Sequence, residues 1–432
     1  RERGNGDVVE ITDTAVVRRA SVKDAVGKRP QAEAASPVGD AFAPLTAVAV
    51  SQWRELTERA IEPNGYYLPG WELAVNAFAT GRTGVSALSA WSDVSLTPDS
   101  AARLIGLMPA ISLWRAYRVP LPALVSAHPY GTLCTPLLDR DTAKDAVAEL
   151  MRQARKAGAH ALVLRDASFD GAAMRAFTEV LRQSGMRPLV LQSHQRACLD
   201  ATRDAEELLR DALGPKKLKE LRRQRHRLTE DGAVRFDVAR TPEDVAAAIE
   251  IFLTLEASGW KGKRGTALLQ DDGDVSFIRH ATIALAATGQ CEIVTLRAGD
   301  TPIAAAIVLR HQDRAFYFKL GVDERFAKFS PGVQLTLDLT RHLCADPAIA
   351  TADSTASPDH PMINPIWRGR LAIGDVLIPL RPNDPVVPLI HTALISRQLV
   401  LDLARRGVRF IRAWRHKRSG AAAFGSTPEP HH

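Results

Sequence analysis

Three short apolar runs separated by two tight polar turns constrain the fold of this chain more than any other feature. The runs cover residues 291–296, 302–309 and 315–320, and the turns between them are residues 297–300 and 311–313. Gly, Asp and Gln residues in such short connections favour a direct reversal of the chain. The pattern therefore predicts an antiparallel three-stranded meander.

A helix with a distinctive start is expected soon after the meander. Ser330 suits the N-cap position and Pro331 the first helical position, and an apolar helical pattern follows them. Gly332 and Val333 would present free backbone N–H groups to a ligand, and Lys328 would add positive charge. These residues predict a phosphate cradle, although an ordinary capped helix would have the same sequence pattern.

Length and charge set the outer limits of the prediction. With 432 residues the chain can form two domains plus tails, and a hydrophobic content of 46% is enough for sizeable cores. The net charge of +7 favours an anionic partner, such as cofactor phosphates, an acidic glycan, nucleic acid or a membrane surface.

Cysteine usage and hydropathy predict a cytoplasmic location. The four cysteines are far apart and mostly lie in apolar runs, which indicates buried free thiols in a reducing compartment. No apolar run is long enough to span a bilayer, and no signal peptide opens the given sequence. A start at Arg1 without Met is compatible with a trimmed upstream segment. No His or Cys spacing suggests a metal site.

Alternating helical and strand patterns predict an α/β fold with mixed sheets in two similar halves. Residues 104–108 and 111–117 are expected to be paired strands that turn at Pro109. Both halves show helices, paired strands, a loop, a helix and further strands, so we expect a structural duplication. The expected parts are a flexible arm, a first lobe, a basic connecting helix, a second lobe and a basic helical tail, at residues 1–45, 46–200, 201–231, 232–385 and 386–432.

Several motifs together resemble a known family. They are the basic segment at residues 221–228, the loop at 255–262 and the helix start at 329–332, with weaker similarity at 136–139 and 360–364. This combination resembles the CelD/BcsL family of bacterial acyltransferases, which are relatives of the Fem-type peptidoglycan aminoacyltransferases. The resemblance is strongest between residues 200 and 345.

The resemblance implies two GNAT-like lobes in tandem, with the catalytic cleft in the second. It also implies an acyl thioester as co-substrate, in the first place acyl-CoA, and no permanently bound cofactor. The expected reaction is N-acylation of an amino sugar or amine in a cell-envelope or exopolysaccharide precursor, including lipid-linked ones. A Fem-like transferase that uses aminoacyl-tRNA and a non-catalytic polysaccharide-binding or membrane-binding accessory protein remain alternatives.

Four residues are candidates for the proton transfer that acylation of an amine requires. Asp323 and Lys319 flank the end of the third meander strand, where acceptor and thioester should meet. Asp323 is the first choice for a general base, and its alternative role is to cap the following turn. Glu256 ends a helix and could accept a proton, and His360 titrates near neutrality. A structural role for His360 is the competing interpretation.

The donor and acceptor would be bound by separate groups. Lys328, Ser330, Gly332 and Val333 are the candidate donor-binding residues. The candidate substrate-binding residues are an indole and a cation on each of two loops, with core packing as the alternative for the first indole: Trp260, Lys261, Trp367 and Arg368.

Two basic segments could contact larger anionic partners. The run at 216–227 could bind an acidic polymer, tRNA or the 3′-phosphate of coenzyme A, or it could be a solvated helix face. Aromatic residues do not interleave it, which argues against single-stranded nucleic acid. The segment at 399–418 combines apolar residues, Trp414 and arginines, which suits peripheral contact with the inner membrane or docking on the second lobe.

Overall fold

The computed structural model describes residues 42–92, 102–258, 267–401 and 403–404. The chain divides into two compact units between Pro37 and Val38, and every described residue belongs to the second unit. The predicted N-terminal arm therefore lies almost entirely outside the described residues, as does most of the basic tail.

The first half contains helices and strands in an order that begins with β1 and ends with β7. Its elements are β1 (Phe42–Pro44), η1 (Leu45–Ala47), α1 (Val50–Glu58), α2 (Pro69–Phe78), β2 (Ser86–Trp91), β3 (Leu104–Ser112), α3 (Leu113–Tyr117), β4 (Ala123–Ser126), β5 (Leu137–Leu138), α4 (Ala143–Lys156), β6 (Ala161–Ser168), α5 (Ala172–Gln183) and β7 (Leu189–Asp200).

The second half begins with a long helix and repeats that order. Its elements are α6 (Ala205–Leu228), η2 (Thr229–Asp231), β8 (Val234–Ala239), α7 (Pro242–Ser258), η3 (Leu268–Gln270), α9 (Asp272–Ala286), β9 (Cys291–Ala298), β10 (Thr301–His311), β11 (Arg314–Val322), η4 (Glu324–Phe329), α10 (Pro331–Cys344), β12 (Thr351–Asp353) and β13 (Gly369–Pro379). Residues 386–401 are helical after β13.

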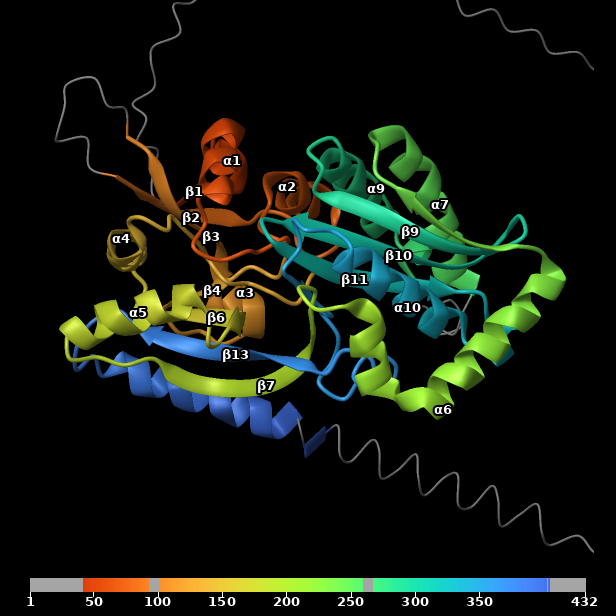
Figure 1. Ribbon diagram of the computed structural model, residues 1–432. Helices are drawn as coiled ribbons and strands as arrows, with labels where there is room; N and C mark the ends of the chain where they lie inside the picture. The colour runs from red at the N-terminus through yellow and green to blue at the C-terminus, as the bar shows by residue number, and fades with distance from the viewer. Residues whose placement is uncertain (1–41, 93–101, 259–266, 402, 405–432) are drawn as a thin grey trace, which may run out of the picture. The chain divides into compact units, whose positions relative to one another are not determined.

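The strands of both halves belong to one mixed sheet within the described part of the chain. Along it the order is β1-β2-β3-β4-β6-β13-β7-β12-β11-β10-β9-β8, with β5 paired to β3. The last strands of the halves are exchanged, because β13 pairs with β6 and β7, and β7 also pairs with β12 (Figure 1). The predicted fold class is confirmed as a mixed α/β fold, with one large mixed sheet and helices on its faces.

The predicted meander is confirmed as β9, β10 and β11, which pair antiparallel in sequence order. The apolar residues of these strands alternate between two cores, because successive side chains of a strand point to opposite faces. Phe316 packs with α2, α7 and α9 on one face, and Tyr317 packs with α6 and α10 on the other (Figure 1). Both cores are therefore needed to hold β11 in place.

Each half contains a parallel strand pair that crosses over through a helix. In the first half β4 pairs with β6 through α4, and in the second half β11 pairs with β12 through α10. Each parallel register covers three residue pairs and then ends. This shared arrangement is the structural duplication that the order of sequence patterns predicted.

The prediction of two paired strands that turn at Pro109 is wrong. Residues 104–112 form one strand, β3, and residues 113–117 form the short helix α3. Pro109 pairs with Ala87 inside the sheet, and its carbonyl accepts a hydrogen bond from Ala127 N at 2.8 Å. Burial on both faces of β3 outweighs the turn preference of proline, and the real break is at Ser112, whose side chain caps α3.

The connecting helix α6 is bent where the sequence placed an interruption. Gly214 has the non-helical angles φ 72° and ψ 164°, and Pro215 follows it. In the described residues no helix is long and apolar enough to cross a membrane. The four cysteines are free thiols; Cys134 and Cys291 are buried, whereas Cys198 and Cys344 are half-buried.

A buried ion pair joins the two halves across the middle of the sheet. Arg196 in β7 and Asp353 in β12 contact each other, and each is 1% exposed. Arg196 also donates to Thr132 O at 2.6 Å, and Asp353 accepts from Thr355 N at 2.9 Å. The pair thus connects β7, β12 and the loop that follows β4.

Replacing Arg196 with methionine should lower the free energy of unfolding by about 3–5 kcal/mol, because Asp353 is left buried without its partner. Urea denaturation would measure the loss. Arg279→Met removes an exposed ion pair with Glu250 and should cost at most about 1 kcal/mol. Equal losses from the two variants would contradict the importance assigned to the buried pair.

A buried histidine also joins the halves and makes stability depend on pH. His311, at the end of β10, accepts a hydrogen bond from Asn64 N at 2.8 Å, and its Nε2 lies 2.9 Å from Thr57 O. Burial lowers the pKa of His311 to about 4. The unfolded state therefore binds a proton below its own pKa, near 6.5, that the folded state does not bind.

Between pH 7 and pH 5 this histidine should remove about 2 kcal/mol from the free energy of unfolding. Urea denaturation at several pH values should show that the free energy of unfolding of the wild type decreases as the pH is lowered. In His311→Gln the free energy of unfolding should depend less steeply on pH, by an amount equivalent to the uptake of up to one proton on unfolding. An unchanged slope in that variant would show that the loss arises elsewhere.

Candidate functional site

A cleft opens in the second lobe where β11 and β12 separate. The two strands pair only from Arg314 to Phe316 on β11, and β11 then continues to Val322 with β10 as its one paired neighbour among the described strands. A cavity of about 330 Å³ occupies the gap. Its lining contains both apolar and polar residues: Tyr317, Phe318, Lys319, Leu320, Val322, Ser354, Thr355, Ala356, His360, Met362 and Ile363.

A β-bulge marks the point where the strands part. The register of β11 against β10 shifts between Tyr317 and Lys319, which leaves Phe318 as the extra residue. Thr355 Oγ1 donates to Tyr317 O at 2.6 Å, which closes the inner end of the cleft. Bulges bend a strand and redirect its side chains, so Phe318 is placed to turn the outer part of β11 away from β12.

The N-terminus of α10 lies against the outer part of the same cleft. A Cβ on Gly332 would come within 2.9 Å of Leu320 Cδ2 and 3.3 Å of both Met362 Sδ and Val322 Cγ1, which all belong to cleft residues. The predicted helix start is confirmed, with Pro331 in the first turn. The expected side-chain cap is not formed, because Ser330 adopts a left-handed backbone and makes no capping hydrogen bond.

The first turn of α10 is therefore only partly open. Pro331 and Gly332 are buried, whereas Ser330 and Val333 are half-buried. The first N–H groups of a helix have no intrahelical partner, and they carry its positive dipole end. A glycine is needed at position 332 because its neighbours in the cleft wall leave no room for a side chain. The sequence had instead predicted that a ligand approaches Gly332 directly.

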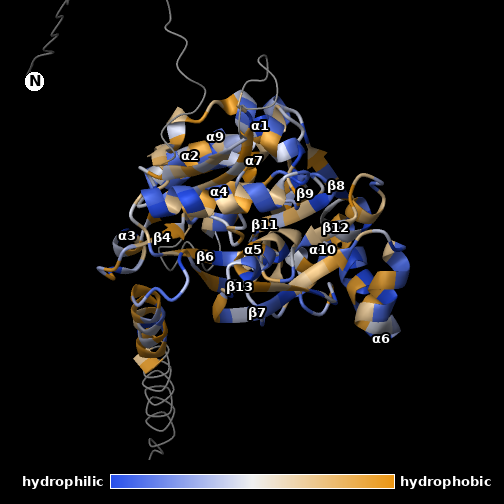
Figure 2. Cartoon of the chain, turned by 90° about the vertical axis from the view of Figure 1, so that its left-hand side faces the viewer, coloured by the Kyte–Doolittle hydropathy of each residue, from blue (hydrophilic) through white to orange (hydrophobic). Residues whose placement is uncertain are grey.

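The basic helix α6 runs beside α10 and adds positive charge there. Gln334 Nε2 donates to Leu221 O at 2.8 Å, Arg225 pairs with Asp338 at 2.8 Å, and α6 also contacts η4. Leu218, Leu221 and Leu228 are its buried residues after the bend, and the hydrophilic positions dominate in Figure 2. The remaining cations are exposed: Lys216, Lys217, Lys219, Arg222, Arg223 and Arg227. Lys328 is exposed too, with its ammonium 4.7 Å from the ring of Phe329.

His360 lines the cleft and also organises the turn that follows it. Its Nδ1 accepts from the backbone N–H groups of Met362 and Ile363 at 3.4 Å each. A neutral ring with this acceptor carries its proton on Nε2. The structural role considered from the sequence is present, and it coexists with a position in the cavity wall.

Lys319 and Glu256 form a pair at the edge of the cleft. Lys319 Nζ lies 3.4 Å from Glu256 Oε1, and Glu256 Oε2 accepts from Leu268 N at 3.1 Å. Glu256 is 2% exposed. Lys319 also lies 5.4 Å from the ring centre of Tyr130, which belongs to the first lobe. Two of the predicted catalytic residues are thus brought together.

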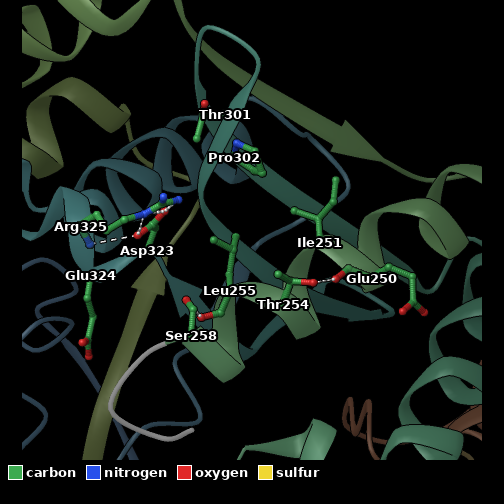
Figure 3. Close-up of a pocket in the computed structure, with 10 residues that line it drawn as sticks. All are labelled: Glu250, Ile251, Thr254, Leu255, Ser258, Thr301, Pro302, Asp323, Glu324 and Arg325. Carbon is green, nitrogen blue, oxygen red and sulfur yellow. Dashed lines mark hydrogen bonds and ion pairs between the residues drawn. The ribbon is translucent and has the colours of Figure 1, made fainter. Parts of the chain in front are cut away.

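Asp323 lies in a different place from the cleft. It caps η4, and Arg325 donates to its carboxylate from the backbone N at 2.9 Å and from Nη2 at 2.7 Å. These hydrogen bonds lower the pKa of Asp323. Figure 3 shows the pair at the edge of a separate cavity, of about 760 Å³, beside Leu255 and Ser258 of α7. The turn-capping role is present, and an ionised carboxylate already held by an arginine is a weak base.

The predicted acceptor-binding residues have three different outcomes. Trp367 is 1% exposed and donates from Nε1 to Thr340 Oγ1 at 3.0 Å, so it is a core residue that a substrate cannot reach. Arg368 is exposed and reaches the carbonyl of Ala212 at 3.4 Å. Trp260 and Lys261 lie outside the described residues.

Sequence reasoning missed the first-lobe side of the site. Tyr130 stands between Lys319 and Arg82, which lies 4.4 Å from its ring centre, and Tyr130 Oη donates to Asp274 at 2.5 Å. Thr355 and the Arg196–Asp353 pair were missed as well. The one signal in the sequence was that Arg196 directly precedes the apolar residues 197–199 of β7. Among the described residues no group of His, Cys, Asp or Glu could hold a metal ion.

Comparison with solved structures supports the fold. A crystal structure of FemX matches 80% of this chain and 98% of its own, with a TM-score of 0.50 and 11% identity. The C-terminal domain of a putative lysylphosphatidylglycerol synthetase from Agrobacterium fabrum covers 80% and 96%, with a TM-score of 0.47 and 13% identity. A tandem GNAT protein from the clavulanic acid biosynthesis pathway covers 79% and 99%, with a TM-score of 0.36 and 15% identity.

Comparison with sequence families identifies the second lobe. No curated protein matches the chain. Residues 215–360 match the family model described as an acetyltransferase (GNAT) domain. This segment holds the part of α6 after the bend, the meander, α10 and most of the cleft lining. The chain therefore carries a GNAT-type acetyltransferase domain in its second half, and the protein is an acyltransferase.

Proposed function

We propose that the protein transfers an acyl group from acyl-CoA to an amine in the cleft between β11 and β12. The observation that carries the proposal is the outer part of β11, which has β10 on one side and a cavity on the other. An extended ligand with amide groups can add to such an open strand edge through main-chain hydrogen bonds. The amide-containing arm of coenzyme A has this chemistry.

The phosphates of the donor would lie at the outer end of the cleft. There the N–H groups of Gly332 and Val333 begin α10, and Lys219 and Arg222 of α6 are exposed nearby. Helix N-termini and cations together favour phosphate groups. Lys328 and Ser330 remain candidates for the same contact.

The reaction needs no covalent enzyme intermediate. The amine nitrogen attacks the thioester carbonyl carbon, the carbon–sulfur bond breaks, and the thiolate of coenzyme A leaves with the electron pair. The attacking amine must lose a proton during transfer. The candidates to receive it are His360 in the cavity wall and the Lys319–Glu256 pair, of which Lys319 lines the cavity.

We propose an amine of a cell-envelope or exopolysaccharide precursor as the acceptor. The family resemblance suggests this class, and the exposed cations around the cleft suit an anionic precursor. The exposed Leu399, Val400 and Leu403 at the end of the last described helix support contact with a membrane surface, where lipid-linked precursors reside. Such a protein would act in the cytoplasm at the inner membrane.

Acyl-CoA binding provides the first test. Calorimetric titration with acetyl-CoA and a longer acyl-CoA should show saturable binding, and Gly332→Val should weaken it about tenfold or more by displacing Leu320 and Met362. Gly70→Val is the matched control, because Gly70 follows a proline at the start of α2 and is packed against Leu285.

The Gly70 variant should bind acyl-CoA like the wild type. Absence of binding to either thioester would reject coenzyme A as donor. Tight, strongly salt-dependent binding of aminoacyl-tRNA would then favour the Fem-like alternative, since phosphate contacts release counterions. Equal losses in both glycine variants would point to a general folding defect.

The proton acceptor provides a second test. Glu256→Gln and His360→Gln are both to be assayed for coenzyme A release with amino-sugar acceptors. The variant that removes the base should lower kcat about a hundredfold or more at unchanged acyl-CoA affinity. Glu250→Gln, on the same helix but paired with Arg279 away from the cleft, serves as the control.

The Asp323→Asn variant tests the general base that the sequence favoured, which the structure places outside the cleft. A large loss in this variant together with full activity of the other two would return the role of base to Asp323. Full activity of all three would show that none of these residues is the base. No coenzyme A release from the wild type, together with complementation by all three variants, would favour the non-catalytic accessory role.

A further inference from the structure

The first lobe contains a second cavity at the end of its own parallel strand pair. The pairing of β4 with β6 ends at Val125 and Val163, and a space of about 290 Å³ opens beyond it. The lining comes from the α2–β2 loop, β3, α3, the segment after β4, and β6: Gly81, Arg82, Val85, Ile111, Arg115, Ala116, Ala127, His128 and Arg165. This volume corresponds to roughly ten water molecules.

The charges around this cavity have one sign. Three arginines and a histidine line it, and none of the described lining residues is an acid. The arginines are held by carbonyl oxygens: Arg115 by Gly84 O at 2.6 Å and Arg165 by Ser126 O at 3.0 Å. Carbonyls orient a guanidinium without neutralising it, so the cavity keeps its positive charge.

The nearest carboxylates are engaged elsewhere. Asp166 follows Arg165 in β6 and attracts it through space, but it does not line the cavity. Asp375 accepts from Asp166 N at 2.8 Å and from Gln192 Nε2 at 2.6 Å. Neither of these carboxylates lines the cavity, so its lining remains cationic.

Several polar atoms of the cavity are buried without a partner. They are Arg165 Nη2, Arg82 Nε and His128 Nδ1. Burial and the neighbouring Arg165 and Arg82 lower the pKa of His128 to about 4, as expected where the local potential is positive. Unpartnered buried donors cost free energy, and an oxyanion would satisfy them together.

A single aromatic ring connects this cavity with the catalytic cleft. Arg82 lies 4.4 Å from the ring centre of Tyr130, and Lys319 lies 5.4 Å from the same centre. Arg82 lines the first-lobe cavity and Lys319 lines the cleft. The two cavities therefore each have a cation against the same tyrosine ring.

We propose that the Arg82, Arg115, Arg165 and His128 cavity binds a phosphate group of the acceptor while the acceptor's amine enters the cleft at Lys319, which pairs with Glu256. This assignment rests on the proposed acyl transfer and narrows its acceptor to an amine that carries a phosphate or diphosphate. The guanidinium groups bind phosphate oxygens in pairs, which orients the acceptor as well as holding it.

Calorimetric titration of the full chain with inorganic phosphate, pyrophosphate and acetate tests the site without any acyl donor. Pyrophosphate should bind more tightly than acetate. Arg165→Gln should weaken pyrophosphate binding about tenfold or more, as expected for a lost charge-assisted contact. Arg115→Gln, at an exposed position, is a second variant in case Arg165→Gln does not fold. Arg182→Gln, exposed on α5, makes the same charge change as a control and should bind like the wild type.

Acetyl-CoA binding measured on the same variants separates this site from the donor site. Arg165→Gln and Arg115→Gln should leave it unchanged, whereas Lys219→Gln/Arg222→Gln should weaken it. The inference would be overturned if pyrophosphate binding is absent from the wild type, or if it is lost only in the Lys219→Gln/Arg222→Gln variant. Either result would leave the proposed function intact. Pyrophosphate binding with no acetyl-CoA binding would support the anion site and reject the donor. Acetate binding as tightly as pyrophosphate would overturn the assignment to phosphate.

Discussion

The short parallel pairing of β11 with β12 is the constraint on which the functional part of this molecule depends. Because it ends at Phe316 and Asp353, β11 keeps an open edge inside a covered sheet. Covered sheets normally hide such edges, since unpaired backbone groups in the interior cost free energy. The bulge at Phe318 keeps the cleft open. Thr355 closes its inner end by donating a hydrogen bond to the carbonyl of Tyr317, the first residue of β11 after the paired segment.

The first lobe supports this opening although it contributes few residues to it. β7, from the first lobe, pairs with β12, and the buried Arg196–Asp353 pair ties β12 to the loop after β4. That loop carries Tyr130 to the side of Lys319. The duplication thus creates two openings of the same origin, one at each parallel pair, and the exchanged last strands keep them in one sheet.

Local patterns predicted much of the fold because they report burial and chain reversal directly. The meander, the break at Gly214 and the helix beginning at Pro331 all follow from short stretches of sequence. The error at Pro109 arose where burial on both faces decided the outcome. Trp367 was misassigned for a related reason, since an indole in a loop segment reads the same whether it faces a ligand or Thr340.

By itself the sequence determined the two α/β halves, the meander and the helix that begins at Pro331, because periodicity and turn residues act over a few neighbours. Only the tertiary structure decided which charged groups meet. Glu256 lies 63 residues from Lys319, and Arg196 lies 157 residues from Asp353, so their pairing depends on sheet order. The same holds for the cationic cavity of the first lobe, whose residues come from five separate segments that only packing brings together.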